Sequence, residues 1–414
     1  MARTRWVIGL ALVASALLAT ALWLGERRQP TSDALLGGPV VPGLLDRLDT
    51  LEEVRVSAAG PETLVTLRRE DDTWRVVERD GWPADVGQLR AWLLGLGQAR
   101  QLEAKTALEK NYAQLGVAGL EHADSRGVRV DLSASGWSAA LIIGHNNPNG
   151  RGSFVRHPDE AQSWLADSDL AIERDPARWL ARSLVSIPES ELVAVELARP
   201  DGGQRLERVD GEESESSWRL APLPDGRQAD ETALYGVAGF LDGLRLEDVR
   251  RAPAPEDEPE LVATFLRQDG LRVEVRLWPD TGEVAETVAM PWAQLRVDVD
   301  AEVSEAFHAS ELARDERALA AAKAPAPGED AGTASPGQDE QAAAAADAGS
   351  EAAGDDQAEA VAPTGPRDLA SRLAATGEEA EQLQARVEGW LFKLPAFKLA
   401  NLRRPAEELL QPAD

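Results

Sequence analysis

Hydrophobic and polar residues follow two periods along the body of the chain, and the order of these periods occurs twice. In the first occurrence, short apolar stretches predict strands at 51–58, 62–69 and 73–78. A helix is predicted to follow, because Leu89, Leu93 and Leu96 recur at helical spacing. Asp85 is its predicted N-cap, since an aspartate side chain accepts a hydrogen bond from a free backbone N–H group.

The same order returns with predicted strands at 191–197, 204–209 and 217–220. Asp230 then opens a second predicted helix and follows Asp85 by 145 positions. The same offset relates Leu89 to Leu234 and Leu96 to Leu241. This ungapped match of cap and core positions predicts an internal duplication, and chance similarity of two strand–helix units is the alternative.

Each repeat continues with a predicted hairpin, a further pair of strands and a short closing helix. The hairpins are 127–132 with 137–143 and 260–266 with 271–277. The strand pairs are 152–157 with 161–165 and 286–290 with 293–297, and the closing helices are 167–173 and 301–313. The predicted fold class is α+β: an N-terminal transmembrane helix, then two tandem duplicated units of antiparallel strands with one main helix each.

A segment of low complexity interrupts the second repeat. Residues 318–365 are mainly Ala, Gly, Pro, Asp, Glu and Gln, which predicts disorder. Residues 366–388 predict an amphipathic helix, and Trp390-Leu391 beyond it resembles Trp179-Leu180 of the first repeat. The predicted layout is an anchor (1–28), a spacer (29–48), a first repeat (49–188), a second repeat (189–317), the insertion (318–365) and a C-terminal helix with a Trp-Leu-Phe segment that completes the second repeat (366–414).

The stretch Trp6–Leu24 is the only long apolar run, with no charged residue and no proline. As a helix it would be roughly 29 Å long, which matches one bilayer core, and tryptophan at each end favours the membrane interface. We expect an uncleaved single-pass anchor; a signal peptide cleaved near Ala19 and Ala21 is the alternative. Two arginines flank each side, so we adopt the usual bacterial arrangement: inner membrane, with the body on the periplasmic side.

Composition narrows the possible partners. The chain has 414 residues and a formal net charge of −29, which disfavours nucleic acid and anionic lipid surfaces as general partners. It contains no cysteine, which excludes disulfides, a lipoprotein anchor, thiolate metal sites and cysteine catalysis.

Short motifs follow the repeat pattern in a fixed order. They are Trp74, Pro83-Ala84-Asp85, Tyr112-x-x-Leu115-Gly116, Ile143-Gly144, Phe154-Val155-Arg156, Trp179-Leu180 and Gly389-Trp390-Leu391-Phe392-x-Leu394-Pro395. This order resembles the family of domain of unknown function 4340 (DUF4340), over most of residues 50–300 and the C-terminal end. The second repeat lacks a clear Tyr-x-x-Leu-Gly, and the acidic insertion departs from the pattern.

The resemblance implies an envelope location. Such proteins are often encoded beside ABC transporters of the gliding-motility auxiliary type, which implies an extracytoplasmic component that acts with the permease. It implies no catalytic residues.

Candidate chemistry is sparse. The four histidines, His122, His145, His157 and His308, show no metal-ligand spacing and are expected in exposed loops or at strand edges. The paired acids, such as Asp71-Asp72, are expected on solvated faces or turns. Gly150-Arg151-Gly152 is interpreted as a hairpin turn rather than an anion cradle. We therefore predict no catalytic, cofactor-binding or metal-binding residue.

Aromatic residues raise two further alternatives. A sugar-binding platform is one, but the tryptophans concerned are expected in the core: Trp74, Trp92, Trp137, Trp164, Trp179 and Trp218. The other is a basic docking patch at the C-terminal end, which we also interpret as core: Trp390, Phe392 and Phe397 with Lys393, Lys398, Arg403 and Arg404.

The sequence thus predicts a non-catalytic, membrane-anchored extracytoplasmic protein, an auxiliary or partner subunit of an ABC transporter or envelope complex. The expected partners are the membrane, through Trp6–Leu24, and a protein of that complex, with no nucleic acid and no cofactor. The alternative is a module that binds an envelope polymer such as peptidoglycan or polysaccharide. A hydrolase would need a polar cleft that the sequence does not locate.

Overall fold

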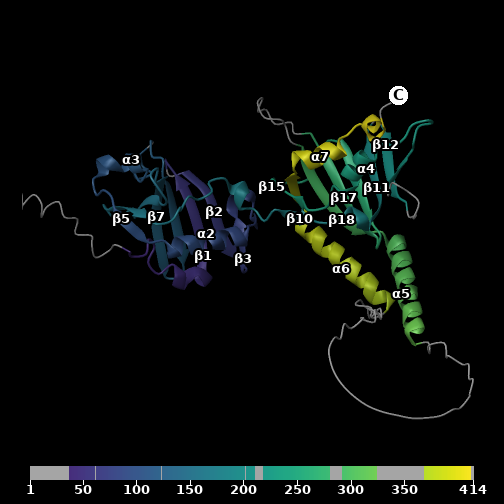
Figure 1. Cartoon of the computed structure of the whole chain (residues 1–414), viewed down its shortest axis with the longest axis horizontal. Coiled ribbons are helices and arrows are strands. Elements are labelled where there is room, and N and C mark those ends of the chain that lie inside the picture. The colour runs from purple at the N-terminus through teal and green to yellow at the C-terminus, as the bar shows by residue number, and fades with distance from the viewer. Residues whose placement is uncertain are drawn as a thin grey trace, which may run out of the picture. The chain divides into compact units, whose positions relative to one another are not determined.

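The computed structural model describes residues 37–60, 62–122, 124–200, 202–209, 218–279, 291–323 and 368–411. These residues form two compact units, each described by itself below. The first unit draws on Met1–Leu184, Arg245–Pro253 and Trp390–Pro395; the second draws on Val185–Leu244, Ala254–Gly389 and Ala396–Asp414. Both contain a large antiparallel sheet with helices, so the predicted α+β class is confirmed (Figure 1).

Several predicted elements lie outside the described residues. They are the apolar stretch Trp6–Leu24, the strand at 286–290 and the insertion from residue 324 onward. Within the described ranges, the structure has no helix that combines the length and the apolar character of a membrane span.

The first unit is built on a nine-stranded antiparallel sheet. Its order is β4 (Trp82–Pro83), β3 (Thr73–Val76), β2 (Glu62–Glu70), β1 (Leu51–Ala58), β6 (Val128–Ala134), β7 (Trp137–Asn146), β8 (Ser153–Arg156), β9 (Ser163–Ala166) and β5 (Gln101–Ala104). Apolar side chains alternate along β6, where Val128, Val130 and Leu132 are buried and the residues between them are partly exposed. One face of these central strands therefore belongs to the core and the other is open.

The main helix of the first unit, α2 (Val86–Gln98), begins where the sequence predicts. The Asp85 side chain accepts a hydrogen bond from the backbone N–H of Gln88 at 2.9 Å. Leu89, Leu93 and Leu96 are buried, which is the face that helical spacing indicates. The helix lies across the strands of the sheet in Figure 1.

Residues 37–44 are fastened along the edge strand β5, and we call them the strap. The backbone N–H of Gly37 donates to the carbonyl of Gln101, and that of Gln101 donates to Gly38, both at 2.8 Å. Val40 and Leu44 are almost fully buried. The predicted spacer, 29–48, therefore includes residues that are part of the first unit, because their apolar side chains fill its core. A 3-10 turn, η1 (Leu45–Thr50), leads from the strap into β1.

The second unit contains a sheet with the order β13 (Trp218–Ala221), β12 (Gly202–Arg208), β11 (Leu192–Arg199), β16 (Leu261–Arg267), β17 (Leu271–Trp278) and β18 (Trp292–Val299). Its helices are α4 (Glu231–Ala238), α5 (Ala301–Lys323), α6 (Leu369–Val387) and α7 (Ala396–Leu402). Asp230 caps α4 by accepting from Ala233 N–H at 2.9 Å, as the 145-residue offset from Asp85 predicts. Two short strands, β10 (Ser183–Val185) and β14 (Leu244–Arg245), lie near the unit boundaries.

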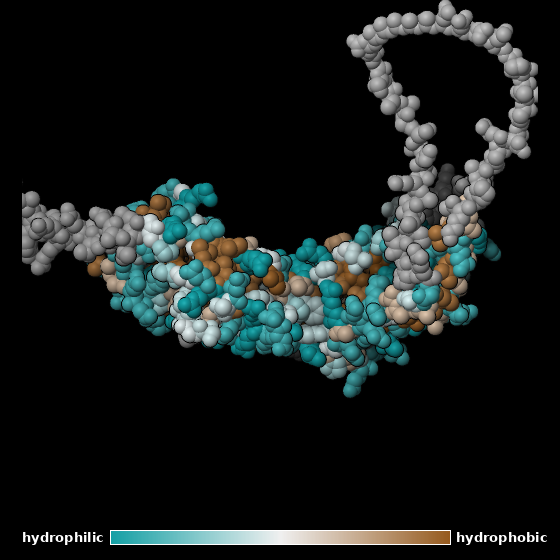
Figure 2. Space-filling model, turned by 90° about the horizontal axis from the view of Figure 1, so that it is seen from below, coloured by the Kyte–Doolittle hydropathy of each residue, from teal (hydrophilic) through white to brown (hydrophobic). Residues whose placement is uncertain are grey.

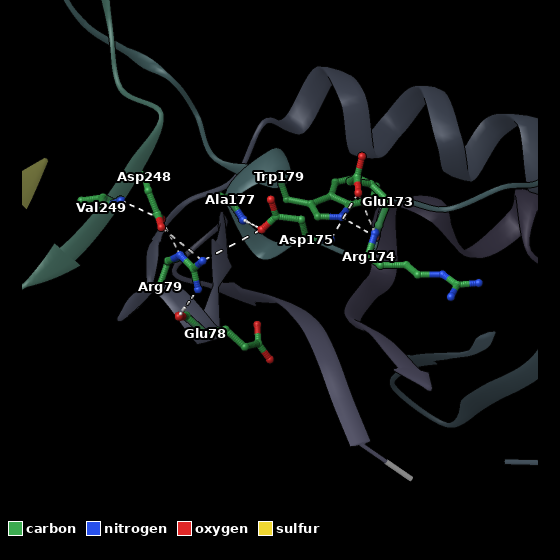
Figure 3. Close-up of polar contacts among 9 residues, drawn as sticks. All are labelled: Glu78, Arg79, Glu173, Arg174, Asp175, Ala177, Trp179, Asp248 and Val249. Atoms are coloured by element: carbon green, nitrogen blue, oxygen red, sulfur yellow. Dashed lines mark hydrogen bonds and ion pairs between the residues drawn. The ribbon is translucent and has the colours of Figure 1, made fainter. Parts of the chain in front are cut away.

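Two strands of the second repeat belong to the first unit. β15 (Asp248–Arg251) pairs with β19 (Trp390–Lys393), and the Trp82 ring meets the Trp390 ring edge-on at 5.0 Å. The Arg79 guanidinium donates two hydrogen bonds to the Asp248 carboxylate, of 2.5 and 3.3 Å (Figure 3). Its Nη2 also lies 4.0 Å from Asp175. Apolar and ionic contacts together hold this strand pair in the first unit.

The strand order recurs between the repeats. β13-β12-β11-β16-β17-β18 has the order of β3-β2-β1-β6-β7-β8, and β15 pairs with β19 as β5 pairs with β9. The sequence comparison placed 293–297 opposite 161–165 in β9, and this correspondence needs correction. β18 pairs with β17 over its whole length, so it takes the place of β8.

The counterpart of Trp179-Leu180 is Leu409-Leu410 rather than Trp390-Leu391. The backbone N–H of Asp85 donates to Trp179 at 2.7 Å, and that of Asp230 donates to Leu409 at 2.9 Å. β-Bridges join Ala84 to Leu180 and Ala229 to Leu410 in the same way. Each helix cap is therefore docked to the end of its own repeat.

Of the two predicted closing helices, the structure contradicts the first and confirms the second. Residues 167–173 form no helix, and a 3-10 turn, η4 (Pro176–Trp179), follows them with Asp175 as its cap. Residues 301–313 are helical, but as part of the longer α5. This helix also includes residues 318–323, so the prediction of disorder was wrong for the start of the insertion. The predicted helix at 366–388 is confirmed as α6.

Candidate functional site

The motif residues of the first repeat, distant in sequence, meet at one place in the first unit. The Tyr-x-x-Leu-Gly motif forms a single helical turn, α3 (Tyr112–Leu115), preceded by the 3-10 turn η3 (Glu109–Asn111). Gly116 ends α3 in the left-handed region, with φ of 72°. The buried cluster around this turn consists of Tyr112, Val117, Ile142, Phe154 and Leu165.

Gly144 explains why the Ile-Gly motif belongs to this cluster. A Cβ atom on Gly144 would lie 2.2 Å from the carbonyl oxygen of Leu115, which is backbone and cannot rotate away. The end of α3 therefore lies directly against β7, and only glycine permits this approach.

Arg156 is the polar centre of the cluster and is only 6% exposed. Its Nε donates to the carbonyl of Val117 at 2.9 Å, and its Nη1 points at the carbonyls of His157, Pro158 and Glu160 at 3.0–3.2 Å. The guanidinium lies over the Tyr112 ring, 4.5 Å from its centroid. A single arginine thus joins the segment after α3 to the β8–β9 loop.

Tyr112 and His157 complete this set of contacts. The Tyr112 hydroxyl donates to the carbonyl of Ala161 at 2.5 Å. The His157 ring nitrogens face two carbonyl oxygens, that of Ala140 at 3.0 Å and that of Val40 in the strap at 2.9 Å. A neutral imidazole has one N–H, so it donates to one of these oxygens at a time. The β8–β9 loop therefore holds both α3 and the strap.

A cleft of about 800 Å³ opens beside Arg156 on the exposed face of the sheet. Strand register places Arg156 in one cross-strand row of its floor: Arg156, Ile142, Arg129, Ser57 and Thr63. Two further rows complete the floor: Ala140, Asp131 and Arg55, then Ser138, Ser133 and Glu53. The walls come from the segment after α3 and from the β8–β9 loop: Gly119, Leu120, Glu121, Pro158 and Asp159.

The charges on the floor of this cleft are paired with one exception. Arg55 forms an ion pair with Glu53 at 2.6 Å, and Arg129 forms one with Asp131 at 2.7 Å. Arg156 forms no ion pair with any described residue, and all its hydrogen bonds go to backbone carbonyls. Within the described part of the chain, it is therefore the one arginine of the lining whose charge no carboxylate balances.

The second unit builds the same sheet without this locus. Its β15–β16 connection, residues 252–260, contains no helix. Both sheets have a register shift at the start of the strand pair, between Leu51 and Glu53 and between Leu192 and Ala194. Aligning the sheets at this shift places Gln294 of β18 where Arg156 stands in β8.

The second unit has its own polar cluster, between α5, α6 and the β16–β17 turn. Arg267 forms ion pairs with Asp269 at 2.7 Å and Glu379 at 2.6 Å, and His308 Nε2 lies 3.0 Å from the Thr376 hydroxyl. Burial opposes ionisation of Asp269, but hydrogen bonds from Arg267 hold its pKa below the usual value. Burial also lowers the pKa of His308, against the attraction of Asp269. The contacts hold α6 to the turn.

The candidate residues named from sequence fall into place as follows. His122 and His145 are exposed, as expected. His157 lies in the β8–β9 loop, also as expected, but it is only partly exposed and its ring contacts two carbonyls. His308 lies on α5, so the expected loop or strand-edge position was wrong for it. Gly150-Arg151-Gly152 is a hairpin turn, closed by Asn147 N–H donating to Gly152 at 2.8 Å. Among the described residues, no group of three or more metal-ligating side chains is gathered in one place.

The aromatic predictions are mostly confirmed. The following tryptophans are buried: Trp74, Trp164, Trp179 and Trp218; Trp92 and Trp137 are partly exposed. In the C-terminal segment Trp390 and Phe392 are buried, whereas Phe397 is 69% exposed. The Lys398 ammonium donates hydrogen bonds to the carbonyls of Gly239 and Asp242, and burial lowers the pKa of Lys398. Hydrophilic residues dominate the surface visible in Figure 2, with separate hydrophobic patches among them.

Fold and site define a class: an antiparallel α+β protein whose first unit carries a polar cleft beside a buried arginine. Residues 74–263 match the model of the family described as "Domain of unknown function (DUF4340)". This match confirms the resemblance drawn from the motif order over these residues. No curated protein and no solved structure matches the chain.

Proposed function

We propose that the protein is a non-catalytic, membrane-anchored extracytoplasmic protein that acts as a partner subunit of an ABC transporter or another envelope complex. The apolar stretch Trp6–Leu24 and the DUF4340 match support this proposal. The repeated strand order supports descent of the body from one duplicated unit, a scaffold that offers two similar surfaces.

The attachment of the strap is the observation that carries the proposal. The chain is fixed to the first unit from Gly37 onward, through backbone hydrogen bonds to β5. Only residues 25–36 separate this attachment from the end of the apolar stretch. Fully extended, such a tether spans roughly 40 Å at most. An anchor in the bilayer would therefore keep the first unit near the membrane surface, where a permease is within reach.

Membrane fractionation and reporter fusion test the anchor and its orientation. We expect the full chain to stay in the membrane fraction through high-salt and carbonate washes, and a chain lacking residues 2–28 to be released. A periplasm-dependent reporter fused after Asp414 should be active. Release of the full chain by carbonate, or reporter activity only in the cytoplasm, would contradict the proposal.

Partner capture tests the complex. Cross-linking in cells followed by purification in mild detergent should recover a reproducible membrane-protein partner with the full chain. A full chain that purifies as a lone monomer in every cross-linking condition would count against a partner subunit.

The cleft of the first unit favours a second candidate, a module that binds an envelope polymer. Its floor carries serine hydroxyls and paired charges, which suit a polar chain. Retention of the purified body on isolated cell-wall material, lost when the cleft is filled by Ser138→Trp, would support this candidate; retention unchanged in that variant would contradict it.

A further inference from the structure

We propose that the cleft of the first unit binds the anionic group, a carboxylate or a phosphate, of a small polar ligand at Nη2 of Arg156. The proposal goes beyond the anchor and the transporter partnership and depends on neither. It rests on the geometry of one buried arginine and of the cleft that it lines.

The first step is the free nitrogen of Arg156. Its Nε and Nη1 donate to four backbone carbonyls, whereas Nη2 donates to no described residue. The Arg156 side chain lines the cleft although the residue is only 6% exposed. Because its other nitrogens are held inside the protein, Nη2 is the part of the guanidinium left for a ligand.

The second step is the fixed orientation of the guanidinium. Tyr112 supports one of its faces, and carbonyls on two segments hold its edge. An arginine on the surface loses side-chain freedom when it binds an anion, whereas this one is already held in place. Anion binding here therefore carries a small cost in conformational entropy.

The third step is the balance of charge. A buried cation without an anionic partner is costly, and carbonyl dipoles offset that cost only in part. The other arginines of the lining are matched by Glu53 and Asp131. An anion at Nη2 would give Arg156 the partner that the described residues do not supply.

The fourth step is the second unit. It forms the same order of strands with Gln294 at the position of Arg156 and without a counterpart of α3. The sheet therefore does not require a buried arginine at this position. A role other than building the sheet explains why the first unit carries one.

The remaining cleft defines the rest of the ligand. Arg129 lies two strands from Arg156 in the same cross-strand row, which is about 10 Å at the usual strand spacing. Ser57 and Thr63 lie beyond Arg129 in this row. Glu121 and Asp159 on the walls oppose a ligand with many negative charges. The geometry fits a ligand with a single anionic group and hydroxyl or amide groups beyond it.

Ligand-observed NMR on the full chain in detergent, at constant ionic strength, tests the proposal. The probes are inorganic phosphate, N-acetylglycine as a carboxylate and N-acetylglycinamide as its neutral analogue. We expect saturable binding of phosphate, of N-acetylglycine or of both, and none of the neutral amide. Binding of phosphate alone identifies a phosphoryl ligand, and binding of N-acetylglycine alone identifies a carboxylate.

Variants connect the binding to Arg156. Arg156→Lys should weaken it by about tenfold or more, because a charge-assisted hydrogen bond is lost. Ala140→Trp fills the cleft one row away and leaves the hydrogen-bond partners of Arg156 in place, so it should abolish binding even if Arg156→Lys does not fold. Arg276→Gln, in the matching row of the second unit, is the control and should bind as the wild type does.

Three results would overturn the proposal. The first is no saturable binding of either anion to the wild type. The second is equal binding of N-acetylglycinamide and N-acetylglycine. The third is wild-type affinity in Ala140→Trp.

Discussion

The β8–β9 connection of the first unit spans residues 157–162, whereas the connection from β18 to β19 spans residues 300–389. The short loop is tied to Arg156, to Tyr112 and, through His157, to the strap. The long connection instead contributes α5 and α6, whose side chains form part of the polar cluster around Arg267. Equivalent positions of a repeated sheet thus carry a compact binding locus in one case and a large insertion in the other.

This difference separates what the repeat needs from what each copy adds. The strand order and the aspartate caps Asp85 and Asp230 occur in both copies. In the described ranges, the turn α3 and the buried Arg156 occur only in the first copy, and Arg267 with His308 only in the second. The shared features hold the framework, and the specific ones are where we expect specific roles.

Removing Arg156 should have the largest effect. Arg156→Met leaves carbonyls that face Nε and Nη1 without donors, so we expect a loss of about 3–5 kcal/mol in the stability of the first unit. Gln294→Met at the matching position should cost less than about 1 kcal/mol. Urea titration followed by hydrogen exchange, which reports each unit separately, measures both values. Similar losses of stability in Arg156→Met and Gln294→Met would contradict the difference between the two units.

The close approach of α3 to β7 gives the next largest effect. Gly144→Ala drives a Cβ into the carbonyl of Leu115 and should cost about 2–3 kcal/mol. Gly95→Ala is the control, since its Cβ would meet nothing within 4 Å and helical alanine is favoured over glycine by about 1 kcal/mol. In thermal unfolding, the midpoint temperature should fall for Gly144→Ala and rise for Gly95→Ala. An unchanged midpoint in Gly144→Ala would show that the contact between α3 and β7 is looser than described.

The helix caps should respond alike in both units. Asp85→Ala and Asp230→Ala each remove one hydrogen bond of 2.9 Å to the first turn of a helix, so each should cost about 1 kcal/mol. Chemical denaturation of the two single variants makes the measurement. Costs that differ by more than about 1 kcal/mol would show that the caps are not equivalent.

The smallest effect is a pH dependence confined to the second unit. Because burial holds the pKa of folded His308 below its ordinary value of about 6.5, the unfolded chain takes up this proton first as pH falls. Stability should therefore decrease as pH falls from about 6.5 toward the folded pKa. The charged groups that face His308 are present in both proteins: Asp269, Glu311, Arg267 and Arg372. The difference between the pH profiles of wild type and His308→Gln therefore isolates the histidine. Identical pH profiles would contradict this account.

Much of the framework could be predicted from the sequence. The caps and the 145-residue offset follow from local rules of helix capping and spacing, and the burial of Trp74 and Trp218 follows from strand alternation. The strands β5 and β15 were missed because each is four residues long and carries exposed polar residues such as Glu103 and Arg250. Their pairing depends on partners far along the chain.

The Arg156 locus could be predicted only in part. The motif order identified Tyr112, Gly144 and Arg156, but not that they meet. The partners of Arg156 are backbone carbonyls, which have no signature in the sequence. The equivalence of Trp390 with Trp179 failed for a related reason, since similar dipeptides occupy different places in the repeat.

The most direct test uses the two tyrosines of the chain, Tyr112 and Tyr235. Tyr112 lies beneath the Arg156 guanidinium, whereas Tyr235 lies on α4 of the second unit. Fluorotyrosine labelling should give two ¹⁹F NMR signals, assigned with Tyr235→Phe. Titration with phosphate or N-acetylglycine should shift the Tyr112 signal saturably and leave that of Tyr235 unchanged. An unmoved Tyr112 signal, or equal shifts of both, would contradict an anion site at Arg156.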